Sequence, residues 1–263
     1  MLRNGEMSES MANHDSETIG RICLGRSGAG IVVVVATGRK SRMRPVFAQE
    51  RSAVNAELFL DRLLGDERRK TGWMRAEAAG DPGPWRQLAL PGRDRWDADA
   101  VRDLVGEYVV EHLSDNDAML VLDETGFLRQ GKESCGVARQ YTGSTGKITN
   151  CQIGVFATCV SRHGHAFIGR ARYLPKSWTD DPVRLKTTAV PEDVGFATKP
   201  RLAARMIARA VAVGVPFRWV AADTVYGIGD IERDLRQAGK GYCPESLKMM
   251  GTTSSASRAH PPL

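Results

Sequence analysis

VLDETGF at residues 121–127 and WVAADTVYG at residues 219–227 are the two runs from which the architecture of this chain follows. Each begins as a short apolar segment, which is typical of a buried strand, and each places an aspartate, Asp123 or Asp223, at the C-terminal end of that strand. Two such aspartates can meet at neighbouring strand ends, where they repel each other unless a cation lies between them. The favoured cation for hard oxygen ligands is Mg²⁺, or Mn²⁺ in its place. The pattern predicts a phosphoryl-transfer site in which Asp123 and Asp223 are catalytic metal ligands; the alternative is that each aspartate only caps a turn.

Six further motifs accompany these aspartates in a fixed order. They are DETGFLRQGK (123–132), GVARQY (136–141), GKITNCQIGV (146–155), YLPKSWT (173–179), GFATKP (195–200) and GVPF (214–217). With them, residues 54–242 resemble bacterial insertion-sequence transposases of the Asp-Asp-Glu superfamily, in particular the insertion-sequence-701 family. The resemblance implies an α/β, ribonuclease-H-like core in which the first and fourth strands are neighbours. It also implies cleavage of DNA at an element end and strand transfer, with Mg²⁺ or Mn²⁺ held by Asp123 and Asp223.

The third acidic residue of that family lies on a helix well downstream of the second aspartate, and this sequence stops at Leu263 before any such helix. We therefore expect a core that is incomplete at its C-terminus and a transposase that is inactive or impaired. The competing hypothesis is a non-catalytic, DNA-binding remnant of a transposase. A ribonuclease-H-like nuclease with another substrate is a third alternative. Glu124 points away from Asp123 by strand alternation, so we predict that it pairs with a neighbouring cation and is not a ligand.

Periodicity supports this order of elements. Continuous or alternating apolar residues predict strands, and a 3.6-residue apolar repeat predicts helices. Thr198 is a suitable helix N-cap, Pro200 fits the first turn and Gly214 ends the helix. The predicted elements of the core are strands 119–123, 152–160, 165–173 and 217–222, a helix from 198 to 213 and a second helix over 231–237.

Composition and periodicity divide the chain into four parts. Residues 1–51 are an atypical segment that we expect to be poorly ordered, and residues 52–117 form a helical N-terminal region with apolar faces at 58–64, 73–79 and 101–109. Residues 118–242 form the partial ribonuclease-H-like core, and residues 243–263 form a polar tail without periodicity that we expect to be disordered. The glycine-rich run before residues 31–35 has the wrong order for a nucleotide-binding loop, because such loops follow a strand.

Four basic residues follow Asp123 within a segment rich in glycine, serine and threonine. Arg129, Lys132, Arg139 and Lys147 are predicted to bind the DNA backbone from a hairpin or loop over residues 126–146. The alternative is an ordinary solvated loop.

The overall composition narrows the class of protein only slightly. The net charge of +6 and the pI near 9.2 are compatible with a polyanionic partner such as DNA. Five cysteines without a close CxxC pair, and the lack of a secretory signal or a membrane-length apolar run, predict reduced thiols in the cytoplasm and no contact with a membrane. Cys151 and Cys159 lie eight residues apart on one predicted strand, too far apart to share a zinc ion. Nothing in the sequence determines whether the chain forms a homo-oligomer.

Overall fold

The computed structural model describes residues 40–243 except residues 66, 68, 93, 114 and 228, and leaves out the side chains at 40, 41, 92 and 224. Most of the predicted N-terminal segment (1–39) and the tail from 244 onwards lie outside this range. The chain divides into two compact units: a helical unit up to residue 114 with residues 162–168, and a sheet unit made of 115–161 and 169 onwards. No helix among the described residues is long and apolar enough to cross a membrane.

The helical unit contains the three predicted N-terminal helices and one, α6 (Trp85–Gly92), that periodicity did not indicate. Its elements are α3 (Lys40–Met43), η1 (Arg44–Val46), α4 (Glu50–Leu64), α5 (Gly72–Ala79), α6 (Trp85–Gly92) and α7 (Ala98–His112). Thr71 caps α5 by accepting a hydrogen bond from the amide of Met74, and Asp97 caps α7 in the same way. The helix α6 was missed because it is only eight residues long and includes Pro91, so its apolar repeat covers little more than two turns.

The core of the helical unit differs in detail from the predicted apolar faces. Phe59 and Leu63 of α4 pack with Ala56 and with Leu90 of α6. The predicted face at residues 73–79 is wrong at Trp73, whose surface is 55% exposed, because the buried positions of α5 are Gly72, Arg75 and Ala76. The short helix therefore buries an arginine while its tryptophan faces solvent.

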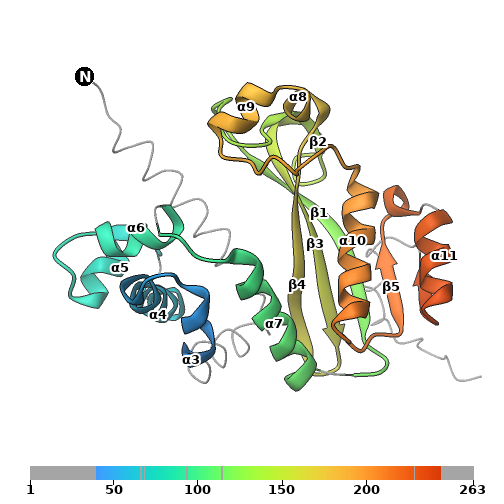
Figure 1. The fold of residues 1–263 in the computed structure, drawn as a ribbon, viewed down its shortest axis with the longest axis horizontal. Helices are drawn as coiled ribbons and strands as arrows, with labels where there is room; N and C mark the ends of the chain where they lie inside the picture. The colour runs from blue at the N-terminus through green and yellow to red at the C-terminus, as the bar shows by residue number, and fades with distance from the viewer. Residues whose placement is uncertain are drawn as a thin grey trace, which may run out of the picture. The chain divides into compact units, whose positions relative to one another are not determined.

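The sheet unit is built on one six-stranded mixed sheet, which confirms the predicted α/β, ribonuclease-H-like class (Figure 1). The strands of the sheet are β1 (Met119–Leu128), β2 (Ala138–Thr142), β3 (Lys147–Ser161), β4 (Gly164–Tyr173), β5 (Trp219–Ala222) and β6 (Gly241–Cys243), and the first residues of β4, 164–168, are those grouped with the helical unit. The order is β2-β3-β1-β5-β6, with β4 also paired to β3. The strand β1 is antiparallel to β3 and parallel to β5, and β5 is parallel to β6. The predicted adjacency of the first and fourth strands is confirmed.

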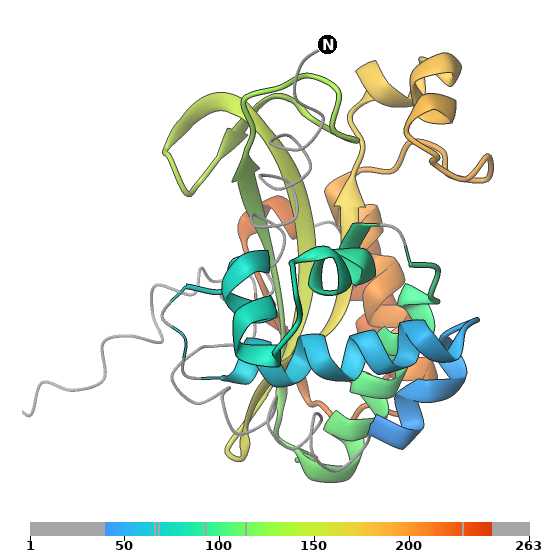
Figure 2. The ribbon, with the colours of Figure 1, turned by 90° about the vertical axis from the view of Figure 1, so that its left-hand side faces the viewer.

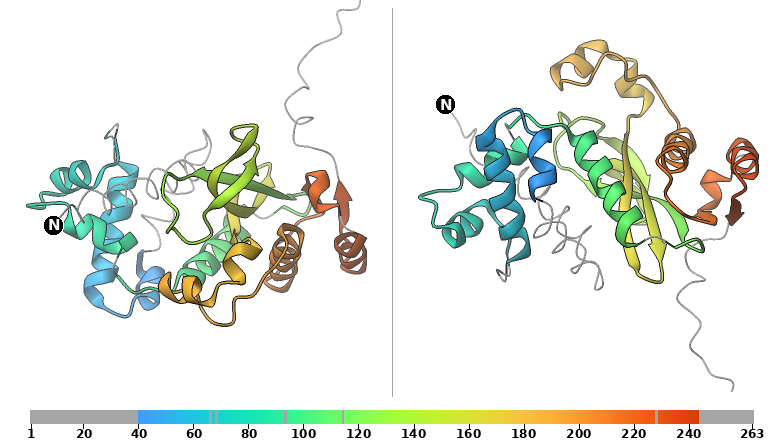
Figure 3. Two further views of the ribbon diagram at one scale, coloured as in Figure 1. Left: turned by 90° about the horizontal axis from the view of Figure 1, so that it is seen from above. Right: turned by 60° about the horizontal axis from the view of Figure 1, so that its bottom comes forward.

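The helices of the sheet unit are α8 (Lys176–Thr179), α9 (Pro182–Thr187), α10 (Lys199–Ala212) and α11 (Gly229–Gln237), with the short η2 (Thr224–Tyr226) after β5. The predicted signals of α10 are confirmed: the Thr198 hydroxyl accepts from the amide of Arg201 at 3.3 Å, and Gly214 follows the helix at φ 73°. Figure 1 shows α10 running alongside the strands, and its buried face includes Ala203, Met206 and Ile207. Figure 3 shows α8 and α9 at the β2 end of the sheet.

The β2–β3 hairpin bends back over β1 (Figure 2). The Ser144 hydroxyl donates to the carbonyl of Gly126 at 3.3 Å, and the side chain of Thr142 occupies the space where a Cβ on Gly126 would lie. Gly126 therefore permits a close approach that no other residue allows. The hairpin or loop predicted over residues 126–146 is not a hairpin with those bounds: residues 126–128 extend β1, residues 138–142 form β2, and β2 forms its hairpin with β3 and not with β1.

Candidate active site

The parallel register of β1 with β5 brings Asp123 and Asp223 to neighbouring positions. The pairing ends with Leu122 opposite Ala222. The residue that follows Leu122 is Asp123, and the residue that follows Ala222 is Asp223. Neighbouring strands are about 4.8 Å apart, and residues opposite each other point to the same face. Asp123 and Asp223 were both predicted to lie at the C-terminal end of a strand, and this prediction is confirmed for Asp223 but wrong for Asp123. Asp223 directly follows β5, but β1 continues beyond Asp123 to Leu128, because β3 pairs with it along its whole length.

The carboxyl of Asp123 lies in an environment that disfavours its charge. Although the side chain reaches solvent, the surrounding protein removes part of its hydration and so raises the pKa. The backbone amide of Glu124 donates to Asp123 Oδ1 at 2.7 Å and lowers the pKa in part. The carboxylates of Glu124 and Asp223 raise it again. Asp123 and Asp223 therefore interact electrostatically across the two strands, and a cation beside them would relieve that repulsion.

Glu124 lies on the other face of β1, and its carboxylate contacts two side chains from distant parts of the chain. Its Oε1 forms an ion pair with Lys199 Nζ at the start of α10, and its Oε2 accepts from the Tyr226 hydroxyl at 2.9 Å. The prediction that Glu124 pairs with a cation is confirmed. Burial raises the pKa of Tyr226, and the carboxylates of Glu124, Asp123 and Asp223 raise it further. Sequence reasoning missed both Lys199 and Tyr226, although each lies within a quoted motif.

A family model described as DDE superfamily endonuclease matches residues 42–243, which is most of the chain. The chain belongs to this family. It is also 32% identical, over 132 residues, to a protein of Microchaete diplosiphon described as a probable transposase for insertion sequence element IS701. That match covers 50% of this chain and 32% of the relative, so the chain spans about a third of the relative's length. The resemblance to insertion-sequence transposases is confirmed.

DDE superfamily endonucleases generally use divalent metal ions, and the donors of this member fit one such ion. Asp123 and Asp223 offer hard carboxylate oxygens from adjacent strands, and water can fill the other positions of the coordination sphere. Within the part of the chain that the structure describes, no cluster of three or more histidine, cysteine, aspartate or glutamate side chains is arranged to hold a metal. The described donors thus fit a single ion better than the two-ion arrangement, which needs more carboxylates.

The four basic residues predicted to bind DNA lie in different settings. Lys132, Arg139 and Lys147 are exposed, whereas Arg129 is half-buried and its guanidinium donates to Gln152. Strand alternation along β3 places Arg139 on the face that carries Asp123 and Lys147 on the opposite face. The structure therefore does not gather the four on one surface.

Sequence reasoning also missed an exposed apolar pair on this hairpin. Tyr141 and Ile148 are directly paired across β2 and β3 and are 58% and 59% exposed. They share a face with Arg139, since Tyr141 is two residues further along β2. Alternation of apolar and polar residues could have indicated a strand with one exposed apolar face. The segment is too short for that alternation to distinguish a strand from a loop.

The loop that precedes β2 is anchored by α8 and α9. Trp178 of α8 is fully buried, and its indole nitrogen donates to the carbonyl of Val137 at 2.7 Å. Arg184 of α9 lies over the Trp178 ring at 3.7 Å and donates to the carbonyl of Lys132 at 2.6 Å. The YLPKSWT motif thus has a structural role in shaping the basic segment.

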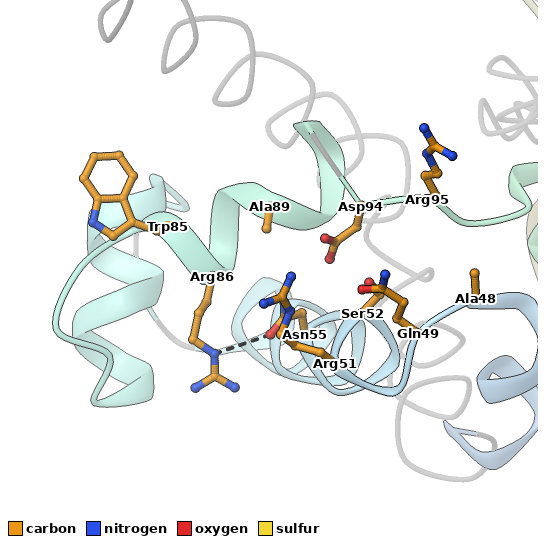
Figure 4. Close-up of a pocket in the computed structure, with 10 residues that line it drawn as sticks. All are labelled: Ala48, Gln49, Arg51, Ser52, Asn55, Trp85, Arg86, Ala89, Asp94 and Arg95. Atoms are coloured by element: carbon orange, nitrogen blue, oxygen red, sulfur yellow. Dashed lines mark hydrogen bonds between the residues drawn. The ribbon is translucent and has the colours of Figure 1, made fainter.

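The helical unit has a separate hollow of about 660 Å³ between α4 and α6 (Figure 4). Its lining includes Arg51, Asn55, Trp85, Arg86 and Asp94, and Arg86 donates to Asn55 at 3.4 Å. Asp81 forms an ion pair with Arg86 at 2.9 Å, so much of the positive charge there is already compensated. This hollow lies in a different unit from the two aspartates.

Proposed function

We propose that this DDE superfamily endonuclease is a DNA transposase that uses Asp123 and Asp223 as its catalytic metal ligands. The observation that carries the proposal is the parallel β1–β5 register, which makes the two aspartates neighbours on one face of the sheet. Mg²⁺ or Mn²⁺ held there would activate the attacking oxygen and stabilise the leaving oxygen. The family match and the relative described as a probable transposase support the assignment.

The substrate would be the DNA at the ends of an insertion sequence, and then a target DNA. Water would first displace the 3′ oxygen at the element end, and the freed 3′-hydroxyl would then attack a phosphodiester of the target and displace the 3′ oxygen of the target strand. The carboxylate of Asp223 raises the pKa of Asp123, and a cation between the two like charges would relieve this repulsion. Arg139, on the face of Asp123, would contact phosphates near the site, whereas Arg129, Lys132 and Lys147 would contact the DNA backbone elsewhere along this segment.

With the carboxylates of the described residues alone, catalysis would be weak, because two aspartates hold one hard ion loosely. A two-ion clamp places its ions roughly 3.5–4 Å apart and needs a further acidic ligand. The second candidate function is therefore DNA binding without strand transfer. The observation that favours it is that no third carboxylate joins the two aspartates in a ligand cluster among the described residues.

Calorimetric titration with Mn²⁺ tests the assignment most directly. The parent chain would be compared with Asp123→Asn, Asp223→Asn and a matched control, Asp230→Asn, whose carboxylate is 75% exposed on α11. We expect binding in the parent and in the control, and loss of binding in both site variants, with circular dichroism showing that all four are folded. A folded parent that binds no Mn²⁺ would rule out the proposed metal site.

Cleavage of a labelled duplex distinguishes the two candidate functions. A protein that binds the duplex and Mn²⁺ without cutting it supports the non-catalytic role, whereas cutting that is lost in Asp123→Asn supports the transposase.

A further inference from the structure

Three elements of the sheet unit converge on the carboxylate of Glu124. The hydroxyl of Tyr226, at the end of η2, donates to Oε2 at 2.9 Å. The ammonium of Lys199, in the first turn of α10, pairs with Oε1. The side chains of Glu124 and Lys199 are only 25% and 21% exposed, so solvent screens this charge pair less than it screens a surface pair.

Tyr226 is tied closely to Asp223. Its backbone amide donates to the carbonyl of Asp223 at 2.9 Å, which closes the short turn after β5. The Tyr226 side chain is 1% exposed, so packing fixes the ring. A hydrogen bond at the hydroxyl of Tyr226 therefore constrains the backbone that carries Asp223.

This constraint acts just beyond the last hydrogen-bonded residue pair of β1 and β5. The parallel ladder of β1 and β5 ends at Leu122 and Ala222, one residue before the aspartates. Beyond that point the ladder no longer sets the spacing of the two strands, and two like charges follow it directly. The hydrogen bond from Tyr226 to Glu124 joins the residue next to Asp123 with the turn that begins at Asp223, and it opposes separation of the two strands there.

We propose that Glu124, Tyr226 and Lys199 form a clamp that sets the separation of Asp123 and Asp223, and that Glu124 is a positioning residue and not a metal ligand. The inference rests on the proposed function, since it concerns how the metal-binding pair is held. Lys199 has its own part in the clamp: its positive charge offsets part of the repulsion that the Glu124 carboxylate exerts on Asp123. Mg²⁺ demands ligand oxygens at 2.0–2.1 Å in near-ideal geometry, so a small loss of alignment weakens binding.

The test is Mn²⁺ calorimetry on the full chain with Tyr226→Phe, which removes only the hydroxyl oxygen. We expect the dissociation constant to rise about tenfold, as expected for the loss of one hydrogen bond to a charged group. Lys199→Met should also weaken binding, and Lys199→Arg should restore most of it because it keeps the cation. The double variant Tyr226→Phe with Glu124→Gln should bind no more weakly than the weaker single variant, because both changes break the same link.

A matched control is Tyr108→Phe, which removes a hydroxyl from another buried tyrosine, in the helical unit. Thermal melts in EDTA accompany every titration, because a merely structural hydroxyl would lower the melting temperature and leave the dissociation constant unchanged. If Tyr226→Phe lowers the melting temperature without changing the dissociation constant, and Asp123→Asn and Asp223→Asn still lose binding, the clamp is wrong. The proposal that the two aspartates bind the metal would not be affected.

Two further outcomes are equally decisive. If Glu124→Gln abolishes binding as completely as Asp123→Asn while Tyr226→Phe and Lys199→Met bind normally, Glu124 is a ligand and the clamp is wrong. If the folded parent binds no Mn²⁺, both the proposed metal site and the clamp are wrong.

Discussion

Replacing Gly126 with alanine should release the β2–β3 hairpin from β1. A Cβ at this position would lie 3.0 Å from Thr142 Cγ2 and closer still to the Cβ and Oγ1 of the same residue. Carbon atoms pack favourably at about 3.5–4.0 Å, so the hairpin would have to move away by about 1 Å. Rotation of the threonine cannot relieve the overlap, because its Cβ is fixed to the backbone.

The expected cost of this substitution follows from what the hairpin loses. Thr142 is 3% exposed and would be partly uncovered, and the 3.3 Å hydrogen bond from Ser144 to the carbonyl of Gly126 would lengthen. Overpacking of this kind typically destabilises a protein by about 1–3 kcal/mol. Gly131→Ala is the matched control, because a Cβ there meets nothing within 4 Å.

Urea denaturation measures the free energy of unfolding, and amide hydrogen exchange over residues 138–150 reports whether the hairpin opens locally. We expect faster exchange in Gly126→Ala than in the parent or in Gly131→Ala. The pair Gly126→Ala with Thr142→Gly should recover part of the loss when compared with Thr142→Gly alone, as a double-mutant cycle would show. A Gly126→Ala variant with the stability and the exchange rates of the parent would refute the close packing of Thr142 on Gly126.

Other consequences can be tested separately. Trp178→Phe should lower the free energy of unfolding by about 1–3 kcal/mol in urea, because the carbonyl of Val137 loses its buried donor; equal stability would show that water replaces the indole. Arg139→Ala should reduce the slope of log affinity for duplex DNA against log salt by about 0.9 in anisotropy titrations, whereas Arg236→Ala, an exposed control on α11, should leave it unchanged. Folding raises the pKa of Asp123, so its contribution to stability is present at low pH and is lost as pH rises through the folded-state pKa. Asp123→Asn in EDTA should therefore be more stable than the parent near neutral pH, with the difference shrinking below the ordinary aspartate range, and a variant less stable than the parent at neutral pH would contradict this.

Local signals in the sequence were reliable where a few neighbouring residues determine the conformation. Thr198, Pro200 and Gly214 marked the two ends of α10 because capping and glycine turns depend only on nearby backbone groups. The apolar run before Asp123 gave the start of β1 for a similar reason, since a strand buried on both faces is apolar at every position. The family resemblance added the order of the strands, which no local pattern contains.

The same signals failed where pairing partners are distant. The strand β1 extends five residues past Asp123 because β3 is long enough to pair with it, although the added residues are not continuously apolar. The strand β2 was missed because its side chains are mostly polar, and it is held by backbone hydrogen bonds to β3. Trp73 was assigned to an apolar face because a helical repeat does not show which side of the helix is covered.

The sequence by itself identified the residues that we propose carry the chemistry: two aspartates that each follow an apolar run, and a basic segment rich in glycine between them. The tertiary structure alone decided how these residues meet. It set the register that makes Asp123 and Asp223 neighbours, the return of the hairpin onto Gly126, and the contacts of Glu124 with Lys199 and Tyr226. The physical reason is that strand and helix signals come from interactions within a few residues, whereas pairing register and side-chain partners join positions 75 and 102 residues apart.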